Sequence, residues 1–140
     1  MITIVGSREL WPIPSVASAV LSIMMDHPGD VFCVRSNRSG DLASGTEDLV
    51  SKIGARIGAT VLPWPPTSST FNRDNSMVTR CSRVYAFFAP GQLMEGGTGH
   101  VAAVALRADV PLIAYTIDDS ASVYVVAEYE REELLEMVNT

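Results

Sequence analysis

The sequence is poor in lysine, in cysteine and in long apolar runs, and each shortage excludes a class of function. A single lysine, Lys52, stands beside nine arginines, and the formal net charge is -6. Sequence-independent binding to nucleic acid requires clustered Lys and Arg, which this chain does not have. We therefore do not expect nucleic acid to be a partner. The arginines sit singly, several of them beside Gly, Ser or Asn, where a planar guanidinium suits a small phosphate-bearing ligand.

Cysteine is also scarce, with Cys33 and Cys81 far apart in the sequence. Both lie in apolar surroundings, and no CxxC spacing is present. This pattern is typical of buried thiols and not of a metal site or a disulfide framework. We therefore expect no metal centre, and no cofactor is indicated.

No apolar stretch approaches the roughly 20 residues that span a bilayer, so no membrane contact is expected. The first ten residues, MITIVGSREL, contain neither a basic segment nor a small-residue cleavage site. A cytoplasmic protein is therefore expected. A length of 140 residues with 47% apolar content predicts one domain over residues 1–140.

Short apolar runs alternate with stretches of helical period along the whole chain. Strands are expected at 2–5, 31–34, 60–64, 84–89, 111–117 and 123–127, the last at a sheet edge. Helices are expected from Pro12 or Pro14 to the HPGD turn, along the stripe Leu49, Ile53 and Ile57, and at 76–82, 98–108 and 130–138. This alternation predicts an α/β fold: a Rossmann-like, doubly wound, mostly parallel sheet with helices on both faces.

Two polar loops follow predicted strands and are expected to meet at the carboxyl edge of the sheet, where such folds bind ligands. They are GSRE, residues 6–9, and EGGTGH, residues 95–100. Glycines let backbone N–H groups approach a phosphate, and the N-terminus of the following helix adds a partial positive charge. Together the two loops predict an anion-binding site.

Single polar residues in and near these loops are candidate ligand contacts. Arg8 and Arg73 are expected to bind phosphate, and Ser7 to donate a hydrogen bond, since no GxSxG motif marks it as a nucleophile. His100 is either a ligand contact or a surface histidine. Glu95 is a catalytic acid or base, a ribose contact or a solvated charge.

Four motifs, taken in order, resemble the SLOG superfamily of Rossmann-like domains, which includes the Lonely Guy phosphoribohydrolases, YspA-like proteins and DNA-processing protein A. They are VGSRE, SGDLASGTED, NRDNSM and GGTGH, and the resemblance covers residues 1–117. It implies a pocket for a nucleotide or a nucleotide-derived molecule. The residues implied in binding are Gly6, Ser7, Arg8, Gly40, Gly45, Asp48, Arg73, Asn75, Gly96, Gly97, Thr98 and Gly99.

The chain departs from the Lonely Guy motif PGGxGTxxE at three positions. Glu95 stands at the proline, His100 at the threonine, and Ala103 at the glutamate that assists cleavage of the N-glycosidic bond. The leading hypothesis is therefore a binding protein that senses or sequesters a nucleotide. The alternative is a nucleoside 5'-monophosphate N-glycosidase or a deoxyribosyltransferase-like enzyme, with Glu95 or Asp48 as the catalytic carboxylate. A DNA-associated role is disfavoured by the acidic charge.

Residues 101–106, VAAVAL, are apolar on every side of the expected helix. Such a helix needs cover on all faces, which a second subunit can supply. A homodimer or larger homo-oligomer is therefore expected.

Overall fold

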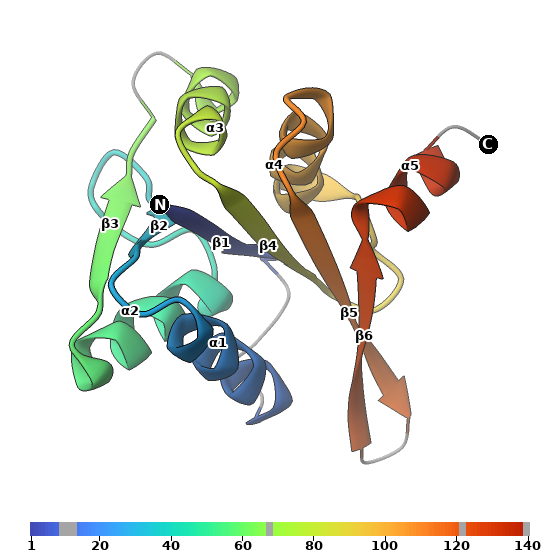
Figure 1. Ribbon diagram of the computed structural model, residues 1–140, viewed down its shortest axis with the longest axis horizontal. Helices are drawn as coiled ribbons and strands as arrows, with labels where there is room; N and C mark the ends of the chain where they lie inside the picture. The colour runs from blue at the N-terminus through green and yellow to red at the C-terminus, as the bar shows by residue number, and fades with distance from the viewer. Residues whose placement is uncertain (9–13, 67–68, 121–122, 139–140) are drawn as a thin grey trace.

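The computed structural model describes residues 1–8, 14–66, 69–120 and 123–138, and its described strands form one six-stranded sheet. The strand order is β3-β2-β1-β4-β5-β6 (Figure 1). Strands β1 to β4 are Ile2–Gly6, Val31–Arg35, Thr60–Trp64 and Arg83–Phe88, and β5 and β6 are Leu112–Ser120 and Val123–Glu130. Neighbouring strands are parallel except β6, which runs antiparallel to β5 at the edge.

Helices cover both faces of this sheet. Figure 1 shows α1 (Pro14–Asp26) and α2 (Gly45–Ile57) on one face. It shows α3 (Thr70–Thr79), α4 (Gly96–Arg107) and α5 (Arg131–Val138) on the other. This confirms the predicted α/β, Rossmann-like, doubly wound architecture. Among the described residues no helix combines the length and apolarity that crossing a membrane requires.

Two helices begin earlier than the sequence pattern predicted, because serine side chains cap them. Helix α3 was expected over residues 76–82 but starts at Thr70, where the Ser69 side chain accepts a hydrogen bond from the Asn72 amide. Helix α2 starts at Gly45 after the N-cap Ser44. The polar residues that follow each cap are typical of a loop. Each capping bond satisfies an amide of the first turn and allows the helix to begin at these residues.

Helix α4 packs into the larger of two buried clusters. Val101, Ala102, Val104 and Ala105 are at most 1% exposed, and they pack with residues of α3, β4 and β5. The chain therefore covers this apolar helix with its own elements. The premise for expecting a homodimer is removed, and the homodimer itself stays a prediction.

The order of the strands fixes where a ligand site can form. The chain moves outward from β1 through β2 to β3, then returns to β4 on the other side of β1. The loops after β1 and β4 therefore leave the sheet in divergent directions and open a crevice at its carboxyl edge. Both glycine-containing motifs, GSRE and EGGTGH, begin at this edge.

Candidate functional site

A cavity of about 780 Å³ opens at the carboxyl edge of β1, β2, β3 and β4. Three segments predicted from the sequence contribute to it: the loop after β1, the first turns of α3 and the first turn of α4. Its lining consists of Gly6, Ser7, Arg8, Arg35, Ser36, Asn37, Leu42, Ala43, Pro66, Thr70, Arg73, Asp74, Gln92, Glu95, Gly96, Gly97, Thr98 and His100. This volume is sufficient for a small organic ligand.

The N-terminus of α4 supplies backbone donors to the cavity. The N-cap is Glu95, whose side chain makes no capping hydrogen bond, and the first intrahelical bond runs from the Gly99 amide to the Glu95 carbonyl. The amides of Gly96, Gly97 and Thr98 precede that bond and have no intrahelical acceptor. Because these residues line the cavity, their N–H groups and the positive end of the helix dipole are available to an anion.

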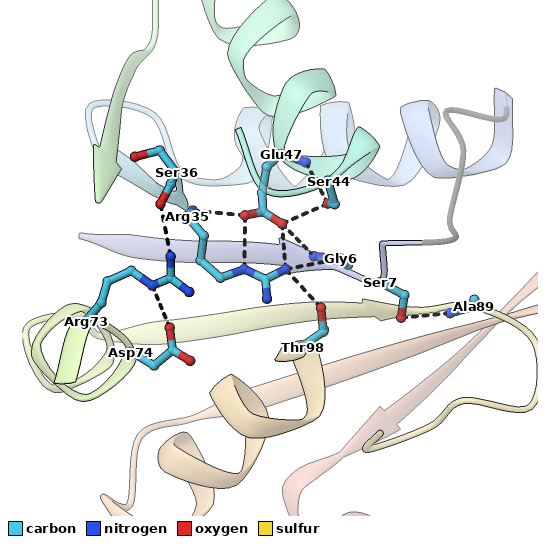
Figure 2. A network of polar contacts seen from close by, with 10 residues as sticks. All are labelled: Gly6, Ser7, Arg35, Ser36, Ser44, Glu47, Arg73, Asp74, Ala89 and Thr98. Carbon is cyan, nitrogen blue, oxygen red and sulfur yellow. Dashed lines mark hydrogen bonds and ion pairs between the residues drawn. The ribbon is translucent and has the colours of Figure 1, made fainter. Parts of the chain in front are cut away.

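A buried ion pair between Arg35 and Glu47 forms the floor of the site (Figure 2). The Glu47 carboxylate is fully buried and accepts from Arg35 Nη2 at 2.7 Å and Arg35 Nε at 3.0 Å. It also accepts from the Gly6 and Arg35 amides and from the Ser44 hydroxyl. Glu47 therefore ties together the ends of β1 and β2 and the start of α2.

Arg35 extends this network toward α4. Its Nη2 donates to the Gly6 carbonyl at 2.8 Å and to Thr98 Oγ1 at 3.0 Å. In Figure 2 its Nη1 carries no dashed line, and a Cβ placed on Gly97 would lie 3.3 Å from that nitrogen. Within the described part of the chain Nη1 has no hydrogen-bond acceptor, so it can donate to a ligand beside Gly97.

Two buried hydroxyls at the cavity are oriented as donors. Thr98 Oγ1 accepts from Arg35, and Ser7 Oγ accepts from the Ala89 amide at 3.2 Å. A hydroxyl that already accepts one bond still has its own O–H to donate. Both residues are almost fully buried and line the cavity. They therefore suit an anionic ligand better than a cationic one.

Arg73, Asp74 and His100 form a second polar chain between α3 and α4. Arg73 Nε donates to Asp74 Oδ1 at 2.8 Å, and Arg73 Nη1 donates to the Ser36 carbonyl at 3.0 Å. The other carboxylate oxygen, Asp74 Oδ2, lies 2.7 Å from His100 Nδ1. Arg73 and Asp74 are buried, and all three residues line the cavity. Each buried arginine of the site therefore faces its own carboxylate.

The structure brings together most of the residues predicted for binding. Those that line the cavity are Gly6, Ser7, Arg8, Arg73, Glu95, Gly96, Gly97, Thr98 and His100. Five other predicted residues, Gly40, Gly45, Asp48, Asn75 and Gly99, are not in its lining. Of these, Asp48 pairs with Lys52 on the exposed face of α2, and the Asn75 side chain bonds the Phe71 carbonyl.

Two glycines of the motifs are required by close packing. A Cβ at Gly6 would collide with the Thr46 side chain, so the first turn of α2 can pack directly against the end of β1. A Cβ at Gly99 would collide with the Met94 backbone. Gly99 therefore shapes the turn that leads into α4 from behind the cavity.

Sequence reasoning missed Arg35, Glu47 and Asp74 as site residues. Glu47 had a signal: Ser44 and Glu47 have the S-x-x-E spacing of a capping box before an apolar run. In the structure the Ser44 hydroxyl bonds Glu47 Oε1 at 2.8 Å. Arg35 ends an apolar strand and Asp74 follows Arg73, but neither pattern specifies a tertiary partner.

Comparison of the sequence with protein-family models and with curated proteins finds no match.

Proposed function

We propose that this protein binds a nucleotide or a nucleotide-derived small molecule at the carboxyl edge of its sheet, in a sensing or sequestering role. The observation that carries the proposal is the convergence of anion donors on one cavity. Gly96, Gly97 and Thr98, whose amides have no acceptor in the helix, line the same cavity as Arg35, and Arg35 Nη1 lies beside Gly97. A phosphate group matches this set, because it accepts several hydrogen bonds at once.

The charges at the site support a directional mode of binding. Arg35 and Arg73 are each neutralised by a neighbouring carboxylate, so a phosphate would gain little from net charge alone. It would gain from oriented N–H and O–H donors. The remainder of the lining includes Leu42, Ala43 and Pro66, which give an apolar surface to the non-phosphate part of the ligand. A nucleotide has both kinds of surface.

A ligand screen tests the proposal directly. The screen would measure thermal shift and bound mass with nucleoside mono- and diphosphates, ADP-ribose and cyclic dinucleotides. We expect at least one of them to raise the melting temperature, as any ligand that binds only the folded state must. The proposal fails if no compound in the set binds at millimolar concentration.

Arg8 offers a cleaner test of phosphate contact than Arg73, because Arg73 also holds Ser36 and Asp74 in place. Arg8 is exposed and lines the cavity. Arg8→Lys keeps the charge and loses the planar fork, so the binding free energy of the nucleotide should become less favourable by about 1–3 kcal/mol. Arg56→Lys, on the exposed end of α2, is the matched control and should leave the dissociation constant unchanged.

A second candidate function, hydrolysis or transfer at the N-glycosidic bond, is favoured by one observation. Asp74 is a buried carboxylate at the cavity and contacts a histidine, an arrangement that acid–base catalysis uses. If this reading is right, the protein releases free base from a nucleoside monophosphate, and Asp74→Asn stops the release while Asp48→Asn does not. Chromatography of the reaction mixture would detect the base.

A further inference from the structure

One aromatic residue in contact with the cavity lining, Phe71, is left exposed by the helix that carries it. Helix α3 buries its other large apolar side chains, Met77 and Val78, completely, yet Phe71 is 54% exposed. Phe71 follows Thr70, which lines the cavity, and precedes Arg73 and Asp74, which also line it. Phe71 therefore lies in the turn of α3 that contributes to the cavity, although its own side chain is outside the lining.

The Phe71 ring is held in place by a cavity residue of the neighbouring helix. Its centroid lies 5.1 Å from that of the His100 imidazole, with the two planes tilted by 41°. The His100 ring is itself fixed by the 2.7 Å contact with Asp74. The His100 side chain is 30% exposed, so the two rings together present a fixed and partly exposed aromatic surface. We call Phe71 and His100 the aromatic wall.

The position of the aromatic wall relative to the phosphate donors fits a two-part ligand. His100 lies one turn beyond Gly96 and Gly97 in α4, so it adjoins the open amides, and the Phe71 ring contacts His100. A phosphate at those amides leaves the rest of the ligand within reach of the wall. Aromatic faces bind planar rings by stacking, and every nucleobase has such a face.

We propose that the aromatic wall selects ligands with a planar ring attached to the phosphorylated part, with Phe71 as the specificity-determining residue. This inference rests on the proposed function, and it adds that phosphosugars without a base bind more weakly. The exposure of Phe71 then has a function, because the ring is covered when the base stacks on it.

The test compares adenosine 5'-monophosphate with ribose 5-phosphate by isothermal titration calorimetry. Phe71→Ala should weaken binding of the nucleotide by roughly five- to a hundredfold, the effect of losing one base–aromatic stack. It should leave the affinity for ribose 5-phosphate unchanged. Phe71→Tyr keeps the ring and should bind the nucleotide as the wild type does. Met25→Ala, which truncates an exposed apolar side chain of α1 away from the cavity, is the matched control and should have no effect.

The outcomes separate this inference from the function on which it rests. If the nucleotide binds wild type and Phe71→Ala equally well, the aromatic wall has no role in recognition and the binding function stands. If Phe71→Ala weakens both ligands equally, Phe71 acts through general packing and the inference is wrong. If neither ligand binds the wild type, this inference fails, and the proposed function fails with it when no compound of the ligand screen binds either. Circular dichroism of each variant confirms that the fold is retained.

Discussion

Glu47 is the residue on which the hydrogen bonds of the site converge, and its neutral analogue glutamine cannot replace it. Its two oxygens accept from Arg35, Ser44 and the Gly6 amide in a fully buried setting. Glu47→Gln would place an NH₂ group against these donors and leave Arg35 buried without its counter-charge. Breaking such a pair costs about 3–5 kcal/mol.

The neighbouring carboxylate is a matched control for this prediction. Asp48 pairs with Lys52 on the solvent-exposed side of the same helix turn. Asp48→Asn should change the free energy of unfolding by no more than about 1 kcal/mol. Urea unfolding of both variants measures the difference. Equal, small effects would mean that the Arg35–Glu47 pair does not organise the site.

Cys33 and Cys81 are buried free thiols, as the sequence predicted, but the fold brings them together. A hydrogen bond from Cys33 lowers the pKa of Cys81 to about 7, and the contact at 3.1 Å with Thr3 Oγ1 acts in the same direction. The same thiol–thiol bond and burial raise the pKa of Cys33 above its usual range. One thiolate is therefore expected near neutral pH.

This pKa predicts a titration that can be observed by absorbance. Because the pKa of Cys81 is lowered, its thiol is protonated below pH 7 and becomes the absorbing thiolate as the pH rises through about 7. The difference in ultraviolet absorbance between wild type and Cys81→Ser isolates the signal. Cys33→Ala removes the donor and should move the midpoint up toward the ordinary value of about 8.5. A wild-type midpoint already at that value contradicts the prediction.

At the scale of the element, the first turn of α4 can serve as a binding loop only if its backbone stays uncovered. Gly97 is exposed, and a Cβ there already approaches Arg35 Nη1. Gly97→Val would crowd that nitrogen and cover the neighbouring amides. We expect nucleotide binding to be abolished, while the unfolding midpoint changes little because the position itself faces solvent.

Glu95 provides the control within the same turn. Its side chain makes no capping bond, so Glu95→Gln should leave nucleotide affinity nearly intact. Dissociation constants of the two variants, measured together, test the role of the backbone against that of the carboxylate. If Gly97→Val binds normally, the phosphate does not sit on α4. If Glu95→Gln stops release of free base without changing affinity, the enzyme hypothesis replaces the binding hypothesis.

For the whole molecule, the apolar sequence of α4 has two explanations: packing within the chain, or packing against a second subunit. The burial of α4 favours the first. Ala102 and Ala105 are fully buried within the chain. Ala102→Glu would place an unpaired charge in the core, a change that cores do not tolerate. We expect loss of cooperative unfolding by circular dichroism. If light scattering shows that the wild type is a dimer and that Ala102→Glu is a folded monomer, this residue lies at a subunit contact instead.

The sequence predicted the architecture because the architecture depends on local periodicity. Apolar runs such as residues 2–5 and the alternation of strand and helix specify a parallel sheet, and a parallel sheet places the loops that follow its strands at one edge. For the same reason GSRE and EGGTGH were identified as parts of the site. The sequence pattern predicts later starts for α2 and α3 than the N-caps Ser44 and Ser69 produce, because polar first turns resemble loops until the cap is seen.

Which side chains meet depends on tertiary packing. Arg35 and Glu47 are 12 residues apart and reach Thr98 on a different helix, and Asp74 meets His100 across 26 positions. No periodicity encodes such pairs, since they depend on how α2, α3 and α4 dock around the sheet. The fold and the two glycine loops can be predicted from the sequence, because both follow from local chain geometry. The polar network behind those loops and the burial of α4 are properties of packing, so only the folded chain determines them.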